Sequence, residues 1–252
     1  MTGPTQADPA RADPALAGPT QTDPAQADPA QAGGRSERAA QTRAAIVEAA
    51  LALFRERGYE ATTMRAVAER AGVSTGNAYY YFSSKEELIL EFYSRNQADH
   101  LAACREVLDS ATSLQGRLGG TMHALVDVLN PYHDFAATLY KHAAEPRSPL
   151  SPFSPESSPA REAAIAIYRE VVEGSSARIG RDLAGRLPEL LWLYSLGIVL
   201  HWVYDGSPGC TRTYQLIDAT VPVIRRLIGA ARLPVLRATA TDIFAIIDKV
   251  RG

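Results

Sequence analysis

The sequence of 252 residues predicts an all-α protein in which a small three-helix head precedes a larger helical domain. Three observations lead to this fold class. Apolar residues recur every three or four positions along most of the chain, which is the period of an amphipathic helix. No segment shows the alternation of apolar and polar residues that marks a half-buried strand. The stretch from Thr63 to Phe82 holds two short helical patterns with a tight break between them.

Composition limits the class of protein before any motif is considered. The chain is 46% hydrophobic, which is enough for a sizeable core in one or two domains. A formal net charge of −2 and a pI near 6.2 argue against a basic protein that coats DNA without specificity. Cys104 and Cys210 lack the spacing of metal ligands, so we interpret them as thiols of a reducing compartment.

Nothing in the sequence predicts secretion or a membrane partner. The N-terminus lacks the basic and then apolar pattern of a signal peptide. The longest uncharged apolar run, residues 190–204, is too short and too polar to cross a bilayer. We therefore expect a soluble, cytoplasmic protein.

Residues 1–35 form a low-complexity segment in which residues 3–17 are nearly repeated as residues 18–32. Its repeated Asp-Pro pairs block helix and strand propagation. The repeat has almost no apolar surface to stack, so we predict a disordered tail. A partner-binding or minor-groove arm is the alternative, but Arg11 is the only basic residue of the repeated part.

The first strong helix is predicted over residues 36–57 and ends at Gly58. Its apolar stripe consists of Ile46, Ala49, Ala50, Leu53 and Phe54. Glycine suits the left-handed conformation that ends many helices. The sequence therefore predicts a helix that stops shortly before the Thr63 to Phe82 stretch.

The Thr63 to Phe82 stretch predicts two short helices and the turn between them. Thr63 is a natural N-cap for the first helix, whose apolar positions are Met64, Val67, Ala68 and Ala71. Gly72 suits the left-handed end of that helix, and Ser74 can cap the next one. In the second helix Ala78 and Phe82 share one face. Two helices joined by such a turn form a helix-turn-helix, whose second helix enters the DNA major groove.

A third helical pattern follows the motif and joins the two domains. Ser84 and Glu87 form a capping box, and the apolar run after them predicts a helix that continues toward Leu108. Later helices are predicted over residues 114–129, 132–144, 160–173, 175–184, 187–204, 213–232 and 235–250, while the Pro/Ser-rich residues 145–159 predict a mobile loop.

The chain resembles the TetR family of bacterial transcriptional regulators from about residue 40 to residue 100. The shared pattern consists of Gly58-Tyr59, Thr62-Thr63, Val67-Ala68, Ala71-Gly72-Val73-Ser74, Gly76, Tyr79, Phe82, Ser84-Lys85 and Leu88. The resemblance implies a DNA-binding domain over residues 40–100 and a ligand-binding and dimerisation domain over residues 101–252. It also implies a homodimer on double-stranded operator DNA and a small-molecule effector. Ala78 departs from the pattern, because a larger aliphatic residue is common there.

The predicted DNA-binding residues lie on the motif and at the start of the next helix. Asn can pair with adenine, Thr can touch a thymine methyl group, and Gly allows close approach. Tyrosyl hydroxyls, cations and free backbone N–H groups suit phosphate. By resemblance the contacts are Thr63, Arg65, Ser74, Thr75, Gly76, Asn77, Tyr79, Tyr80 and Lys85. The alternatives are helix-start chemistry for the first turn and ordinary surface charge for Arg65 and Lys85; Tyr81 is expected to be half-buried.

Two further sets of residues are predicted in the helical domain. Aromatic and polar side chains suit a small effector, and we place the effector site at His123, Tyr132, Tyr140 and Trp192, with ordinary core or surface positions as the alternative. The last long helices are apolar enough to pair with their mates in a dimer. The predicted interface residues are Leu190, Tyr194, Gly197, Ile198, Ile217 and Ile224, with a monomer core as the alternative.

Catalytic and cofactor motifs are missing from the sequence. There is no nucleophile elbow, zinc-protease motif, phosphate-binding loop or dinucleotide fingerprint. We therefore predict a non-enzyme without cofactor or metal, namely a repressor released from a palindromic operator by its effector. The alternatives are an activator or effector-independent regulator, and a ligand-sequestering or interaction protein that keeps the fold without binding DNA.

Overall fold

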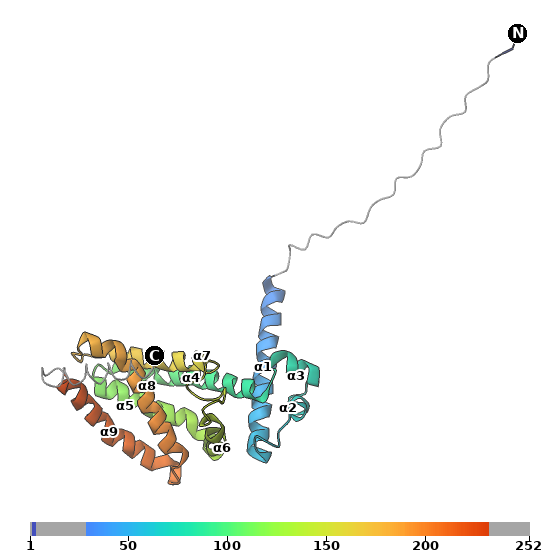
Figure 1. The fold of residues 1–252 in the computed structure, drawn as a ribbon. Coiled ribbons are helices and arrows are strands. Elements are labelled where there is room, and N and C mark those ends of the chain that lie inside the picture. Colours follow the sequence, from blue (N-terminus) through green and yellow to red (C-terminus); the bar gives the residue numbers. More distant parts are fainter. Residues whose placement is uncertain (1, 4–28, 232–252) are drawn as a thin grey trace. The chain divides into compact units, whose positions relative to one another are not determined.

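The computed structural model of the chain describes residues 2–3 and 29–231 (Figure 1). The chain divides into two units, residues 1–41 and residues 42–252. The described residues form α-helices and short 3-10 helices, with no strand in these ranges, so the predicted all-α class is confirmed. The predicted helix over residues 235–250 and most of the predicted tail lie outside the described ranges.

The head consists of α1 (Pro29–Arg57), α2 (Met64–Arg70) and α3 (Thr75–Tyr81). Gly58 and Gly72 have φ values of +83° and +69°, as the predicted helix ends require. The Thr63 hydroxyl accepts from the Ala66 N–H at 3.2 Å, and the Ser74 hydroxyl accepts from the Asn77 N–H at 3.1 Å. The predicted turn and both of its caps are therefore confirmed.

The first helix begins earlier than the sequence predicts. α1 starts at Pro29 rather than Ser36, so residues 29–35 are helical instead of disordered. Proline is well tolerated in the first helical turn, where its missing N–H has no intrahelical partner. The Gly33-Gly34 pair weakens the helix but does not forbid it, because glycine lowers helix propensity by only about 1 kcal/mol per residue.

The linking helix α4 (Lys85–Ser110) is continuous, as predicted. The Ser84 hydroxyl accepts from the Glu87 N–H at 3.3 Å, which is one half of the predicted capping box. The other half differs, because the Glu87 carboxylate accepts from the Ser83 N–H at 2.7 Å and from the Ser83 hydroxyl at 2.7 Å. The return bond therefore reaches one residue further back than a standard box.

The larger helical domain continues from α4 through the remaining helices. These are α5 (Leu114–Leu129), η1 (Asn130–Tyr132), α6 (His133–Ala143), α7 (Ser158–Glu173), α8 (Arg181–Val203), η2 (Pro208–Cys210) and α9 (Thr211–Ala230). α4 packs against α5 and α7, α7 packs against α8, and α5 packs against α9 (Figure 1). α8 is the one described helix long and apolar enough to cross a membrane, and eight of its side chains are buried in this bundle.

The predicted helix over residues 175–184 is wrong. Residues 176–180 are not helical, and the Ser176 N–H instead donates to the Thr112 carbonyl at 2.8 Å. One helix, α8, then runs from Arg181 through Pro188 to Val203. Leu187, Pro188 and Leu191 are buried, and this packing offsets the hydrogen bond that proline cannot make.

Part of the Pro/Ser-rich loop is packed, although Glu145 and Phe153 are exposed. Ser154 and Ser157 hydroxyls both donate to the Pro149 carbonyl, at 2.7 and 3.2 Å. Leu150 is buried in the hydrophobic cluster of the head, and Ser151 and Ser157 are buried too. The sequence predicts a mobile loop here because its serine and proline residues show no apolar periodicity. In the structure, hydrogen bonds from serine hydroxyls to a backbone carbonyl hold the loop instead.

Two hydrophobic clusters make up the core of the described residues. The head cluster combines α1 to α4 with Phe135 and Leu139 of α6 and with Leu150. The second cluster combines the end of α4 with α5, α7, α8 and α9. Phe54 and Phe135 stack at 5.7 Å between ring centroids, so α6 contributes directly to the packing of the head.

Candidate nucleic-acid interface

α3 presents a polar and aromatic surface on one side and a buried residue on the other. Ala78 is fully buried against the head cluster. Thr75, Gly76 and Asn77 are exposed, so the first turn of α3 is free to meet a partner. The outer surface of α3 therefore carries the residue types that read base edges in a major groove.

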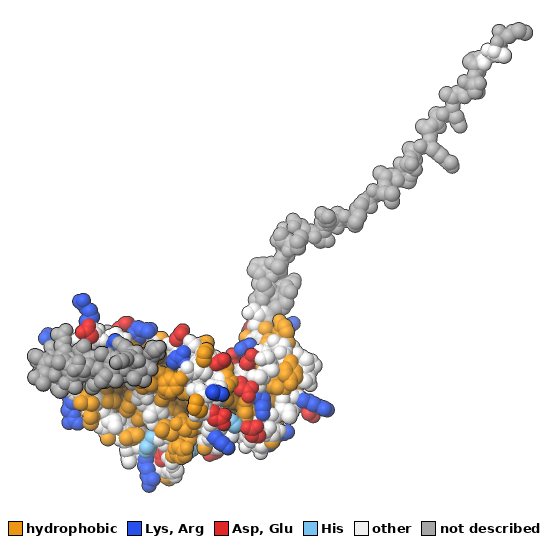
Figure 2. All heavy atoms as spheres, in the orientation of Figure 1, with side chains coloured by type: hydrophobic (Ala, Val, Ile, Leu, Met, Phe, Trp, Pro, Cys, Tyr) orange, Lys and Arg blue, Asp and Glu red, His pale blue; other side chains and the backbone are white. Residues whose placement is uncertain are grey.

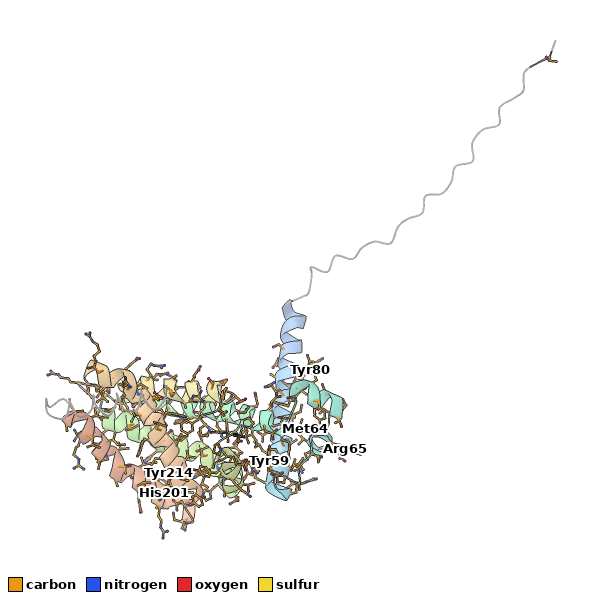
Figure 3. The ribbon with its side chains drawn as sticks, in the orientation of Figure 1. Tyr59, Met64, Arg65, Tyr80, His201 and Tyr214 are labelled. Atoms are coloured by element: carbon orange, nitrogen blue, oxygen red, sulfur yellow. The ribbon has the colours of Figure 1, made fainter. Side chains whose placement is uncertain are left out.

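The three consecutive tyrosines separate by exposure. Tyr80 is 82% exposed and Tyr79 is 52% exposed, which is unusual for large aromatic side chains. Tyr81 is half-buried beside the head cluster, as predicted, and its ring meets Tyr80 edge-on at 5.2 Å. Figure 3 shows Tyr80 and Arg65 at the surface of the head. Two tyrosyl hydroxyls are thus available to phosphate or base edges.

Lys85 has a partner inside the head. Its ammonium donates to the Tyr59 carbonyl at 2.7 Å and lies 4.3 Å from the centre of the Tyr59 ring. The Tyr59 hydroxyl donates to Glu86 at 2.6 Å. Lys85 and Glu86 together fasten the start of α4 to the end of α1. The sequence places Tyr59 in the family pattern but gives no sign of this joint, which depends on contacts across 26 residues.

Two other basic residues of the head, Arg43 and Arg65, differ in whether they form an ion pair. Arg43 pairs with Glu91 at 2.7 Å and lies 4.5 Å from the centre of the Phe82 ring. The hydrogen bond from Arg43 to Glu91 raises the pKa of the guanidinium above its ordinary value. Arg65 is exposed and forms no ion pair within the described ranges. Arg65 is therefore the better placed of the two for a phosphate.

The four predicted effector residues each have a different neighbour in the structure. His123 lies 3.0 Å from Asp218 of α9, while the Tyr132 hydroxyl accepts from Arg95 at 3.1 Å. The ring centres of Tyr140 and Tyr204 are 6.4 Å apart, and Trp192 is buried and packs against Phe153. A described cleft of about 490 Å³ lies beside Tyr59 and α6, and none of the four side chains lines it.

A polar network that the sequence does not reveal joins α8, α9 and η1. Trp202 donates to the Asn130 side chain at 2.9 Å, and Asn130 donates to the Tyr214 hydroxyl at 3.0 Å. Buried Asp205 accepts from the Thr213 N–H at 2.8 Å and from its hydroxyl at 2.7 Å. Burial alone raises a carboxyl pKa, but hydrogen bonds from Ser207 and Thr213 outweigh it and hold the pKa of Asp205 below its ordinary value.

The predicted interface residues of α8 and α9 divide into two groups. Ile198 and Ile217 lie in the core of the protomer, which corrects their assignment to a surface. Helical periodicity on an apolar helix does not show which face is outermost, and this is the physical reason for the error. Gly197 is exposed, whereas the other three predicted residues are partly buried: Leu190, Tyr194 and Ile224.

Large apolar side chains remain exposed on the same two helices. They are Leu200 and Tyr204 near the end of α8, and Val223 and Leu227 on α9. Leu227 is 64% exposed and Tyr204 is 73% exposed. Figure 2 shows hydrophobic side chains gathered over the part of the surface where α8 and α9 lie. Exposed apolar side chains gathered in this way are typical of interaction surfaces.

Comparison with known proteins finds two family models that match separate parts of the chain. Residues 46–92 match the model of the tetR family of bacterial regulatory proteins. Residues 117–242, half of the chain, match the model of the tetracyclin repressor-like C-terminal domain. In the part of the chain that the structure describes, no three His, Cys, Asp or Glu side chains gather as a metal site.

The curated relatives include the transcriptional repressor KstR2 of Mycobacterium tuberculosis, which is 36% identical over 101 residues. That match covers 40% of this chain, and the chain spans about half the length of that relative. KstR2 of Mycolicibacterium smegmatis is 28% identical over 170 residues, covering 65% of this chain and 80% of the relative.

Solved structures agree on the fold. The fatty acid degradation regulator FadR of Bacillus halodurans superposes with a TM-score of 0.57 at 18% identity, covering 71% of this chain and 94% of that chain. FadR of Thermus thermophilus superposes with a TM-score of 0.52 at 23% identity, covering 71% and 92%. With a matching head, a matching C-terminal domain and this fold, the chain belongs to the TetR family of bacterial regulators.

Proposed function

We propose that this protein is a cytoplasmic, homodimeric repressor of transcription that binds a palindromic operator and leaves it when a small effector binds. The observation that carries the proposal is the outer surface of α3, where Thr75, Gly76, Asn77, Tyr79 and Tyr80 are all exposed. An exposed second helix of a helix-turn-helix is the element that enters the major groove. Relatives named as transcriptional repressors support the direction of regulation.

The apolar surface of α8 and α9 supports the proposed dimer. Exposed Leu200, Tyr204, Val223 and Leu227 give each protomer a surface that a second copy can cover. A two-fold dimer carries two α3 helices, and its symmetry matches a near-palindromic operator.

The response to an effector rests on α4. This helix starts beside α3 and ends in the core of the larger domain, so a ligand that moves α4 changes the position of the head. Release follows if the ligand prefers the arrangement that does not fit the operator. The FadR structures of Thermus thermophilus and Bacillus subtilis were solved with lauroyl-CoA and stearoyl-CoA, which supports an effector in this fold.

The test begins with DNA selected by the purified protein from a genomic pool, followed by gel-shift titrations on the selected site. Tyr80→Ala is expected to weaken binding roughly tenfold or more, since it removes an exposed contact from the centre of the interface. Phe153→Ala, which changes an exposed aromatic residue of the Pro/Ser-rich loop, is the control and is expected to bind as wild type. Selection of no DNA would favour a ligand-sequestering protein that merely keeps the fold.

A second candidate function is activation. The activator FasR of Mycolicibacterium smegmatis is 37% identical over 86 residues, so relatives of this head serve both kinds of regulator. Deleting the gene and measuring transcripts beside the selected sites separates the two. A repressor's targets rise, and an activator's targets fall.

A further inference from the structure

Arg117 of α5 is a buried cation that forms no ion pair within the described ranges. It is 6% exposed, and its guanidinium donates only to backbone carbonyls. Nε donates to Val171 at 3.1 Å, Nη2 to Glu170 at 2.7 Å, and Nη1 to Ala111 at 3.0 Å and also to Leu108. A buried charge lowers stability unless its surroundings compensate it, so these carbonyls must replace a carboxylate.

The four carbonyls lie at the C-terminal ends of two helices. Leu108 and Ala111 lie at the end of α4, and Glu170 and Val171 lie at the end of α7. The last four carbonyls of a helix have no amide partner in its regular hydrogen-bond pattern. Each helix end carries about half a negative charge, so two ends together supply roughly the one charge that the guanidinium needs. Arg117 therefore joins the ends of α4 and α7 to α5.

Gly174, the residue directly after α7, leaves room for this guanidinium. A Cβ atom at Gly174 would lie 2.2 Å from Nη2 and 2.5 Å from Cζ of Arg117. Both distances are far shorter than a van der Waals contact, so alanine would displace the guanidinium or the end of α7. The φ of Gly174 is −79°, which any residue adopts. The need for glycine at this position therefore comes from Arg117 and not from the backbone.

The helix that Arg117 holds at one end carries the DNA-binding head at the other. Lys85 and Glu86, at the start of α4, are bonded to Tyr59 at the end of α1. α7 packs against α8, which bears part of the exposed apolar surface of the proposed dimer (Figure 1). Arg117 thus lies where the helix that carries the head meets the helices that would join two protomers.

We propose that Arg117 is a positioning residue for operator binding. It fixes the angle between α4 and the dimerising helices, and so the separation of the two α3 helices in the dimer. This proposal rests on the proposed function and names a residue that sets its geometry. α4 has 26 residues, so it is roughly 39 Å long. A rotation of about 5° at its C-terminal end moves its start by about 3 Å, which is close to the rise of one base pair, about 3.4 Å.

The experiment measures the affinity of the full chain for its selected operator and for versions with one base pair inserted or removed between the half-sites. Wild type is expected to bind the altered operators roughly tenfold or more weakly, since a rigid dimer fits one half-site spacing. Arg117→Met is expected to reduce this ratio to about threefold or less, because the angle of α4 is no longer fixed. A loss of folded protein would weaken binding at every spacing equally, so the ratio isolates positioning from stability.

Two control variants separate Arg117 from ordinary packing. Arg105→Met removes an exposed pair with Glu170, at 3.0 and 3.2 Å, that also links α4 and α7. It is expected to keep the wild-type ratio, since exposed ion pairs contribute little. Gly174→Ala is expected to lower the ratio as Arg117→Met does, and it keeps the cation if Arg117→Met fails to fold. Gly185→Ala, where a Cβ meets open space, is its control and is expected to bind as wild type.

Either of two results would overturn the proposal. One is a wild type that binds all three spacings equally well. The other is a wild-type ratio in both Arg117→Met and Gly174→Ala, with lower melting temperatures, which would make Arg117 a structural residue only. Both results leave operator binding standing. A wild type that selects no DNA from the genomic pool would instead overturn the proposed function, and this proposal with it.

Discussion

At the scale of single residues, basic side chains of the head differ in whether they bond within the head or remain exposed to a partner. Lys85 and Arg65 are both basic and both belong to the predicted DNA-binding set. Lys85 is engaged by the Tyr59 carbonyl and ring, whereas Arg65 is exposed without an ion pair in the described part of the chain. We therefore expect different roles for the two residues, although the sequence pattern treats them alike.

A pair of variants tests this difference. Arg65→Ala is expected to reduce the slope of log affinity against log salt by about 0.9, since one phosphate contact disappears, and to leave stability unchanged. Lys85→Met is expected to cost about 1–2 kcal/mol of unfolding free energy, because a charged donor to a carbonyl is lost. Gel shifts over a salt series and urea unfolding measure the two effects. A normal unfolding midpoint with a reduced salt slope in Lys85→Met would make Lys85 a phosphate contact instead.

His100 is expected to make the stability of the folded protein depend on pH. Its pKa is lowered in the folded state by burial, so the unfolded chain takes up its proton first as the pH falls. The stability that depends on neutral His100 is present above about pH 6.5 and is lost as the pH falls through the lower folded pKa.

The measurement is the unfolding midpoint of wild type and His100→Gln at about pH 7.5 and about pH 5.5. Wild type is expected to lose more stability than the variant over this interval. Equal losses in wild type and His100→Gln would show that His100 does not titrate on unfolding.

At the scale of elements, the helices that the sequence predicts best are those with strong local signals. The caps at Thr63, Ser74 and Ser84 and the stops at Gly58 and Gly72 are local, and the structure confirms each. Features that depend on contacts between residues far apart in the sequence cannot be predicted from a local pattern. The start of α8 at Arg181, the packed Pro/Ser-rich loop and the joint at Tyr59 are all of this kind.

The same reasoning explains where the structure places the candidate residues. The exposed residues of α3 follow from one buried residue, Ala78, because a short helix has few ways to face a core. On the apolar α8 and α9, period alone does not separate the core from the outer surface, so Ile198 and Ile217 prove to be core.

Leu150 tests the packing of the Pro/Ser-rich loop. Leu150→Ala removes a 1% exposed side chain from the head cluster and is expected to cost about 2–5 kcal/mol of unfolding free energy. Glu145→Ala, an exposed change in the same loop, is expected to stay within about 0.5 kcal/mol of wild type. Urea unfolding of both proteins decides between a packed loop and a mobile one. Equal midpoints would mean that Leu150 does not contribute to the head.

At the scale of the whole molecule, the unpaired apolar surface of α8 and α9 is the dominant feature. Leu227→Glu is expected to raise the dissociation constant of the proposed dimer roughly tenfold or more, because it places a charge on the apolar surface that the second copy would cover. Phe153→Glu is a matched control, since Phe153 is 65% exposed and Leu227 is 64% exposed. Light scattering during size-exclusion chromatography measures both proteins. An unchanged dissociation constant in Leu227→Glu would show that the dimer interface lies elsewhere.

The membership of the head cluster limits how this protein can be recombined. Phe135, Leu139 and Leu150 lie after the linking helix in the sequence, yet they complete the core of the N-terminal head. A chimera cut in the middle of α4 would give a foreign regulator this head without those three side chains. The chimera would then rely for operator binding on a head that lacks part of its core. Exchange of parts with a relative therefore needs a junction after residue 157, or a transplant of the three side chains together with the head.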